Sequence, residues 1–247
     1  MKNLLVLILS ISFSFASAQL TTRTIEVKQG QMDKFIEMAG KKTKKYNNEE
    51  GSARFFTYEI LTGSNAGMIW RMRAANAEYM DNWDSNSEES EYWQKNVGPY
   101  ISNGNVNGMY MWNYVGPMSH NVDSEDQNLT MALIYEFKDS GEEDFWRFRE
   151  RVVAARSAMD TQPKGSMHSV YCSSGCNGNV AMILFEYESF TDQQLYNQEM
   201  LPQMIEKYNE LYGNDAYEQD GNKVDESLVE NGRGRLYLRY IPEASSD

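Results

Sequence analysis

One pattern of expected elements occurs twice in this chain, and it limits the fold more than any other feature. In each copy, a strand and a helix precede two strands joined by a Gly-containing turn, and a helix and a last strand follow. The paired strands are expected at residues 54–60 and 68–73, and again at residues 166–171 and 182–187. Both copies therefore read as βαββαβ, a unit that folds as a four-stranded antiparallel sheet with both helices on one face.

Hydrophobic periodicity predicts the other elements of each copy. In the first copy these are a strand at 21–28, a helix from residue 32, a helix at 78–96 interrupted near 85–87, and a strand at 109–115. In the second they are a strand at 129–138, a helix at 142–159, a helix at 191–212 that Pro202 kinks or divides, and a strand at 235–241. The sequence thus predicts an α+β protein with two tandem ferredoxin-like repeats, at 19–118 and 129–247. A polar linker at 119–128 joins them, and an acidic insertion without strong periodicity occupies 213–232.

The first 18 residues have the composition of a secretory signal peptide. Lys2 precedes a short apolar run at 4–11, and small residues at 16–18 precede Gln19. The run is too short to span a membrane, and no Cys follows the small residues to accept a lipid. We therefore expect an exported protein, periplasmic or extracellular, that begins at Gln19 and has no membrane anchor.

Charge and cysteine content restrict the partners and the chemistry. The chain carries 36 Asp and Glu against 23 Lys and Arg, a formal net charge of −13, which argues against nucleic acid or an anionic membrane as partner. A lysine-rich stretch at 41–45 is interpreted as the solvated end of a helix rather than as a phosphate site. In an exported protein, Cys172 and Cys176 are expected to form a disulfide. A ring this small stabilises a fold by only about 2 kcal/mol.

A lone βαββαβ sheet would leave one face uncovered, and two copies in one chain can cover each other. This element order resembles the dimeric α+β barrel superfamily, which includes antibiotic-biosynthesis-monooxygenase-like and NIPSNAP-like domains, here as a tandem fusion. The resemblance implies two sheets that face each other. It does not select a function, because members include cofactor-free oxygenases, haem enzymes, isomerases and domains without known chemistry. A fused pair is self-contained, so we expect a monomer, with a homodimer as the alternative.

A cavity between the two sheets is the predicted ligand site. Its expected lining suits an aromatic or carboxylate-bearing small molecule, because ligand pockets combine apolar walls with a few aimed polar groups. The lining residues are Tyr58, Trp70, Arg71, Asn113, Tyr171 and Arg239. The alternative interpretation is that these aromatic side chains are ordinary core and that the arginines lie at strand edges.

Four residues are candidates for catalysis: Glu26, Glu136, His168 and Arg71. Glu26 and Glu136 occupy matching places in the two copies, where an inward carboxylate is costly unless it is paired or solvated. His168 is the only strand candidate for the inward histidine of haem-binding superfamily members, and no second matched residue accompanies it. Two histidines are too few for a histidine-rich metal site. We therefore predict no cofactor and no metal.

Three functions fit these observations. The first is an exported small-molecule-binding protein with its pocket between the sheets. The second is a cofactor-independent oxygenase or isomerase acting on a small organic substrate. The third is a cell-surface interaction module that works through the insertion at 213–232. The sequence alone does not decide whether the protein is an enzyme.

Overall fold

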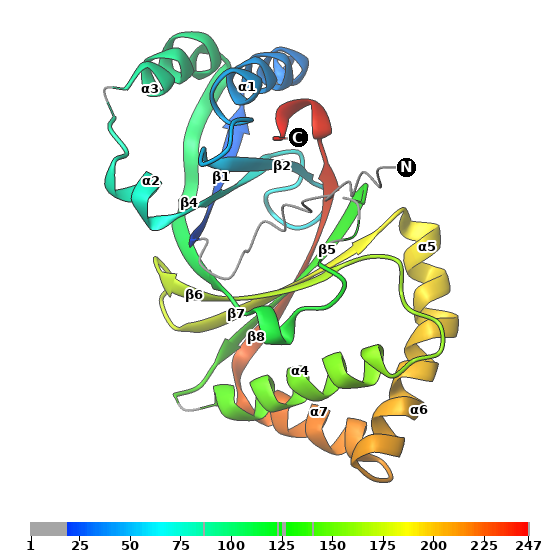
Figure 1. Cartoon of the computed structure of the whole chain (residues 1–247). Coiled ribbons are helices and arrows are strands. Elements are labelled where there is room, and N and C mark those ends of the chain that lie inside the picture. Colours follow the sequence, from blue (N-terminus) through cyan, green and yellow to red (C-terminus); the bar gives the residue numbers. More distant parts are fainter. Residues whose placement is uncertain (1–18, 86, 123, 125–126, 140, 247) are drawn as a thin grey trace, which may run out of the picture.

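Eight antiparallel strands close into a barrel in the computed structural model, which describes residues 19–246 except 86, 123, 125, 126 and 140 (Figure 1). The predicted signal peptide at 1–18 lies outside the described residues. In chain order the strands are β1 (Gln19–Val27), β2 (Arg54–Ile60), β3 (Ile69–Ala75), β4 (Ile101–Tyr114), β5 (Leu129–Phe137), β6 (Met167–Ser174), β7 (Asn179–Tyr187) and β8 (Leu228–Tyr240). The mixed α+β class is therefore confirmed.

Seven α-helices cover the outside of the barrel in the described part of the chain. They are α1 (Met32–Tyr46), α2 (Ala77–Asp81), α3 (Glu88–Tyr92), α4 (Glu142–Ser157), α5 (Phe190–Leu195), α6 (Leu201–Tyr212) and α7 (Ala216–Ser227). A π-helical turn follows α3 at Trp93–Val97, and another at Tyr196–Met200 separates α5 from α6. The expected break near 85–87 is present between α2 and α3. The expected division near Pro202 is also present, because Pro202 lies in the first turn of α6.

The strand order is the same in both halves of the barrel. Around the barrel it runs β1-β3-β2-β8-β5-β7-β6-β4, so each half has the order fourth, first, third, second along its own sheet. The halves join at two seams. Residues 58–60 of β2 pair with β8, and residues 111–114 of β4 pair with β6. Because both seams are hydrogen-bonded, no sheet edge is left open.

One face of every strand points into the barrel. An apolar cluster there receives side chains from all eight strands, and its buried members are Leu20, Tyr58, Ile60, Ala74, Trp112, Ala132, Val170, Met182, Leu184 and Leu238. The space between the two sheets therefore contains packed side chains. The other face of each strand carries the alternate residues and meets the helices.

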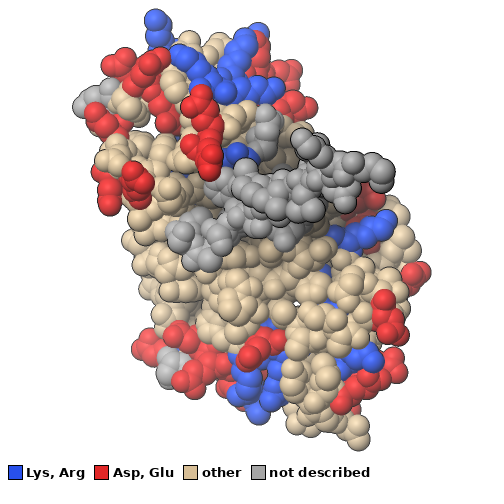
Figure 2. Space-filling model, in the orientation of Figure 1, with Lys and Arg blue, Asp and Glu red and all other residues tan. Residues whose placement is uncertain are grey.

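The helices form two separate outer layers (Figure 1). In the first half, Phe35 and Ala39 of α1 pack on Ile25 and Ile69 of the sheet. In the second half, α4 and α7 pack on β5 and β7 through Phe145 and its neighbours. Figure 2 shows that charged side chains of both signs gather over the helices at the two ends of this face, with fewer between them. None of the helices in the described ranges is long and apolar enough to cross a membrane.

The insertion at 213–232 has regular structure although its sequence lacks strong periodicity. Residues 216–227 form α7, and β8 begins at Leu228 inside the insertion. Ala216, Asp220 and Val224 recur every four residues and form the buried face of α7. Asp220 accepts hydrogen bonds from Tyr208 and Arg151, each at 2.6 Å, and this pairing allows a carboxylate to be buried there.

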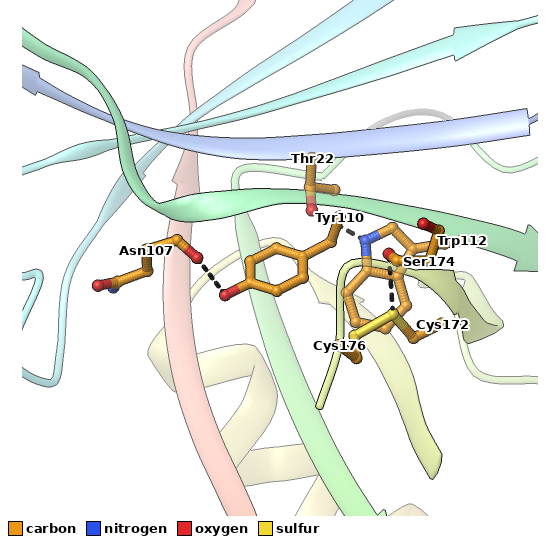
Figure 3. The surroundings of a disulfide bond; sticks show 7 residues. All are labelled: Thr22, Asn107, Tyr110, Trp112, Cys172, Ser174 and Cys176. Atoms are coloured by element: carbon orange, nitrogen blue, oxygen red, sulfur yellow. Dashed lines mark hydrogen bonds between the residues drawn. A yellow bond between two sulfur atoms is a disulfide. The ribbon is translucent and has the colours of Figure 1, made fainter. Parts of the chain in front are cut away.

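The expected disulfide joins Cys172, which pairs with Trp112 in the second seam, to Cys176 (Figure 3). Both sulfurs pack against the apolar cluster inside the barrel. Beside them, the Trp112 indole donates a hydrogen bond to Thr22 Oγ1 at 2.8 Å. The bridge encloses Gly175, whose φ of +92° favours glycine. The disulfide therefore fixes a tight turn at one end of the barrel.

Candidate functional site

Three arginines lie on the helix-facing side of the first-half sheet. Arg23 of β1 stands directly opposite Arg71 of β3, and Arg73 stands opposite Thr21. Like charges placed opposite each other on neighbouring strands are destabilising. The same face of these strands carries the buried core residues Ile25 and Ile69. Core packing therefore gives no reason for three guanidinium groups at these positions, which makes the surface a candidate functional site.

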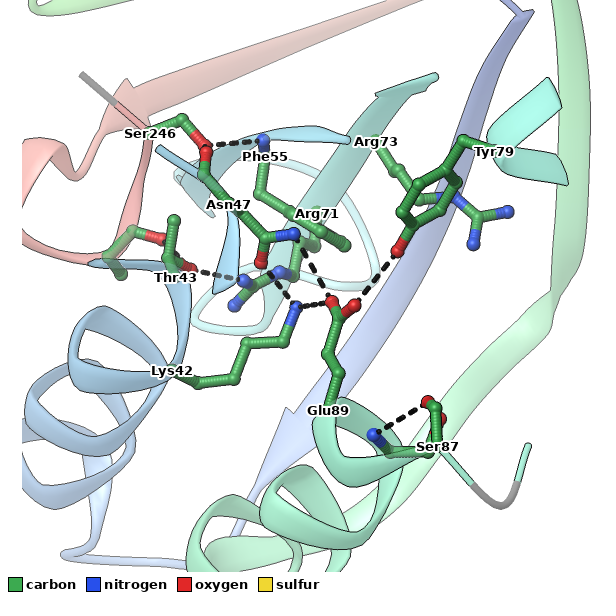
Figure 4. Close-up of polar contacts among 12 residues, drawn as sticks. Lys42, Thr43, Asn47, Phe55, Arg71, Arg73, Tyr79, Ser87, Glu89 and Ser246 are labelled. Atoms are coloured by element: carbon green, nitrogen blue, oxygen red, sulfur yellow. Dashed lines mark hydrogen bonds and ion pairs between the residues drawn. The ribbon is translucent and has the colours of Figure 1, made fainter. Parts of the chain in front are cut away.

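Arg71 is the most deeply buried of the three, with 2% of its surface exposed. Its guanidinium lies between the rings of Phe55 and Trp93, at 4.6 and 4.9 Å from their centroids. Its Nη2 donates a hydrogen bond to Thr43 Oγ1 at 2.8 Å (Figure 4). Nε and Nη1 have no hydrogen-bond partner among the described residues. Buried donors of a charged group are normally satisfied. Two donors of Arg71 are thus available to an anionic ligand.

Burial and mutual repulsion lower the pKa values of these arginines. Burial, followed by the charge of Arg23, lowers the pKa of Arg71 to about 9. Burial, followed by the charge of Arg73, lowers the pKa of Arg23 to about 10. Both groups remain protonated at neutral pH. The protein therefore maintains two poorly solvated positive charges side by side, at a cost that an anion would offset.

A cavity of about 410 Å³ opens over these arginines, between the sheet and the helices α1, α2 and α3. We call it the arginine pocket. It is lined by Thr21, Thr22, Arg23, Lys42, Phe55, Arg71, Arg73, Tyr79, Met80, Trp83, Ser85, Glu89, Ser90, Trp93, Gln94 and Met109. Its volume lies within the range of about 300–1,000 Å³ that is typical of small-molecule sites. Trp83 and Met109 are each about half exposed, which places apolar surface within reach of an entering ligand.

A hydrogen-bonded chain crosses the pocket from α1 to α2 (Figure 4). Lys42 of α1 donates to Glu89 of α3 and, at 2.6 Å, to Asn47 Oδ1. The second carboxylate oxygen of Glu89 accepts from the Tyr79 hydroxyl at 3.0 Å. Burial raises the pKa of Glu89, but Lys42 and the hydrogen bonds from Asn47 and Tyr79 outweigh it, so the net pKa is lowered. Glu89 is therefore an ionised carboxylate held by three donors.

The pocket has an excess of positive charge. Four basic side chains line it, namely Arg23, Lys42, Arg71 and Arg73, against the single carboxylate of Glu89. Such a site can bind a carboxylate, phosphate or sulfate group, and the rings of Phe55, Trp83 and Trp93 can contact an aromatic body.

The six predicted ligand-binding residues lie in four different places. Tyr58 and Trp70 face the barrel interior, where their rings are 5.6 Å apart. Arg71 lies in the arginine pocket. The other three lie on the outer face near the seams. Near the β4–β6 seam, Asn113 donates a hydrogen bond to the Tyr171 hydroxyl at 2.7 Å. Near the β2–β8 seam, Arg239 forms an ion pair with Glu59 at 3.1 Å. The structure therefore brings only Arg71 of this set into the candidate site.

The other catalytic candidates also lie apart. Glu26 is exposed near the end of β1, and Glu136 is half-buried near the end of β5. His168 pairs with Leu184 across the second-half hairpin, facing the barrel interior, and its Nε2 is 2.8 Å from Ser166 Oγ. Burial lowers the pKa of His168 to about 4. These three side chains do not line the arginine pocket.

Sequence analysis missed most of the pocket, namely Arg23, Lys42, Arg73, Tyr79 and Glu89. The sequence contains a signal for two of these residues, Arg23 and Lys42. Arg23 shares a strand face with Ile25, so it points toward the helix layer and not toward solvent. Lys42 continues the stripe formed by Phe35 and Ala39 at helical spacing, which turns it inward.

Several solved structures share this fold. A putative monooxygenase from Lactobacillus acidophilus NCFM superposes with a TM-score of 0.62 at 10% identity, covering 91% of this chain and 94% of that one. A putative monooxygenase from Fusobacterium nucleatum subsp. nucleatum gives 0.63 at 12% identity, with 92% and 93% covered. A mutant chlorite dismutase from Candidatus Nitrospira defluvii gives 0.52 at 9% identity, with 92% and 93% covered.

These similarities confirm the predicted resemblance at the level of fold: the chain has the dimeric α+β barrel fold along nearly its whole described length. At such low identity they say nothing about its chemistry. No protein-family model matches the sequence, and no curated protein matches it either.

Proposed function

We propose that this protein binds an anionic aromatic small molecule in the arginine pocket. The observation that carries the proposal is Arg71, a buried guanidinium with two unfilled donors that stands opposite a second arginine. A protein that needed only stability would do better with apolar side chains at such positions. Retaining the charges is reasonable if a bound anion neutralises them.

The ligand class follows from the walls of the pocket. Arginine binds carboxylates through charge-assisted hydrogen bonds, and Arg23 and Arg73 lie beside Arg71 to complete such a clamp. Phe55 and Trp93 already hold the guanidinium between their rings, so a flat ligand can extend the stack. An aromatic carboxylic acid combines both features. It belongs to the class that the sequence predicted, in a pocket between sheet and helices instead of between the two sheets.

A thermal-shift experiment with matched ligand pairs tests this proposal. The mature protein is melted with benzoate, 2-naphthoate and indole-3-acetate, and with the neutral amide of each acid. At a concentration one hundred times its Kd, a ligand stabilises the native state by about 2.7 kcal/mol. For a chain of this size the melting temperature should therefore rise by roughly 5–10 °C with an acid. The amides should give little or no shift, because they lack the charge that the arginines require.

Two results would overturn the proposal. Equal shifts from an acid and its amide would show that the charge of the ligand is not recognised. No shift from any aromatic anion, with phenyl phosphate and phenyl sulfate included in the panel, would show that the pocket does not bind this class at all.

A cofactor-independent oxygenase or isomerase is the second candidate. It is favoured by the two similar structures described as putative monooxygenases, each of which covers more than nine-tenths of this chain. Incubating the tightest-binding acid with the protein in air and analysing it by mass spectrometry separates the two functions. A binding protein returns the acid unchanged, whereas an oxygenase adds oxygen to it. The interaction module built on 213–232 stays a prediction.

We also propose how the whole chain is organised around the arginine pocket. We propose a signal peptide at 1–18, and hence export to the periplasm or the extracellular space, followed by ferredoxin-like repeats at 19–118 and 129–247. The matching strand order of the two halves supports the repeat interpretation. The arginine pocket would then belong to the first repeat alone, because its lining comes from residues 21–109.

A further inference from the structure

Lys42 differs from the other lysines of the 41–45 stretch. Lys41 and Lys45 are more than half exposed and form ordinary surface ion pairs with Glu37 and Glu88. The Lys42 side chain is 4% exposed, and its Nζ lies 3.9 Å from the centroid of the Phe55 ring, inside the arginine pocket. Burying an amine in a cavity lined with arginines is unfavourable for a purely structural ion pair.

The surroundings of Lys42 favour a reactive amine. Burial, followed by the charge of Arg71, lowers the pKa of Lys42 to about 7, although Glu89 acts in the opposite direction. At pH 7 about half of this amine is neutral, against roughly one part in 3,000 for an exposed lysine. Desolvation and a neighbouring cation are the means by which proteins activate lysine as a nucleophile toward carbonyl groups.

A proton acceptor is already in place. Glu89 bridges the Lys42 ammonium and the Tyr79 hydroxyl, with one carboxylate oxygen on each (Figure 4). The carboxylate can take a proton from the amine and return it to an oxygen bound in the same cavity. The pocket thus combines an amine, an acid–base group and a carboxylate clamp.

We propose that Lys42 forms an imine with the carbonyl group of an aromatic 2-oxo acid whose carboxylate is bound by Arg71 and Arg23. This inference rests on the proposed function and names the substrate class for the same pocket. The Lys42 ammonium passes a proton to Glu89, and the free Nζ attacks C2 of the acid, so that a C–N bond forms as the carbonyl π bond breaks. Glu89 relays a proton from the nitrogen to the oxygen. A second proton from Glu89 releases that oxygen as water, leaving a protonated C=N bond and Glu89 ionised.

Reductive trapping tests this step without any assay of turnover. The mature protein is incubated with phenylpyruvate and sodium cyanoborohydride at pH 7, and the adduct is located by peptide mass spectrometry. We expect one adduct per chain, on Lys42, formed at least about tenfold faster than on exposed Lys41 because of the larger neutral fraction. Lys42→Arg should abolish the adduct, and Lys41→Arg should leave it unchanged.

Phenyllactate distinguishes failure of this inference from failure of the proposed function, because it presents the same ring and carboxylate without a carbonyl group. If phenyllactate raises the melting temperature but phenylpyruvate gives no adduct, or gives adducts spread evenly over exposed lysines, the imine is wrong and the binding site stands. If neither these two acids nor any other aromatic anion of the panel shifts the melting temperature, both are wrong. Trapping in the wild-type protein decides the matter even if Lys42→Arg does not fold.

Discussion

Replacing Arg71 with methionine should weaken the binding of an aromatic acid by about 10- to 100-fold, because hydrogen bonds from a charged donor contribute about 1.5–3 kcal/mol. The same change should leave the melting temperature unchanged or raise it. Methionine fills similar space between Phe55 and Trp93, and it removes a buried charge that faces Arg23. Loss of function together with retained or increased stability identifies a residue kept for a ligand and not for the fold.

Titration calorimetry and thermal melting of the same Arg71→Met preparation measure both quantities. Arg239→Met tests the alternative placement of the ligand, since Arg239 lies on the outer face near the β2–β8 seam, paired with Glu59. We expect Arg239→Met to bind as tightly as the wild type. If Arg239→Met loses affinity while Arg71→Met retains it, the ligand does not occupy the arginine pocket. A large drop in melting temperature for Arg71→Met would instead make this arginine a structural residue.

Gly40→Ala should destabilise the protein by about 2–3 kcal/mol, the upper part of the usual range for overpacking a tight contact. Alanine in a helix interior ordinarily stabilises, by about 1 kcal/mol relative to glycine. Here a Cβ on Gly40 of α1 would lie 2.1 Å from the backbone oxygen of Glu243. The Glu243 backbone cannot move freely, because Thr57 Oγ1 donates a hydrogen bond to the next carbonyl, that of Ala244, at 2.9 Å. We expect the melting temperature to fall by roughly 5–10 °C.

Gly221→Ala in α7 is the matched control. A Cβ at Gly221 would meet nothing within 4 Å, so only helix propensity acts and the variant should be stabilised by up to about 1 kcal/mol. Opposite signs for the two substitutions, measured by thermal or urea unfolding, are the expected result. If Gly40→Ala also stabilises, α1 does not pack against the C-terminal segment as described. The packing of α1 matters to the arginine pocket because this helix also carries Lys42, which lines the pocket, and Thr43, which accepts a hydrogen bond from Arg71.

Much of the fold could be predicted because its signals are local. The hairpin strands are rich in aromatic and long apolar residues and are bounded by Gly-containing turns, so the ends of β2, β3, β6 and β7 lie within three residues of those predicted. The strands β4 and β8 extend much further toward their N-termini than predicted. Residues 102–108 are Asn, Ser and Gly except for Val106, and Asn and Gly have low strand propensity. Pairing with β1 along most of β4 outweighs that low propensity.

The candidate site was harder to predict because alternation does not say which strand face meets the helices. Trp70 and Arg71 are adjacent on β3 and must point to opposite sides, yet both were assigned to one cavity. Burial on both faces of each sheet removed the usual contrast between polar and apolar sides. Glu89 and Tyr79 reach the pocket from short helices, and tertiary contacts determine the directions in which the side chains of these helices point. Sequence periodicity carries no information about such contacts.

A crystal structure of the protein with the aromatic acid that gives the largest thermal shift tests the central claim most directly. The account predicts electron density for the acid between β1, β3 and α1, with its carboxylate within hydrogen-bonding distance of Arg71 Nε or Nη1, the two donors that have no partner among the described residues. Density for the acid inside the barrel between the two sheets, or in the helix layer of the second half, would contradict it.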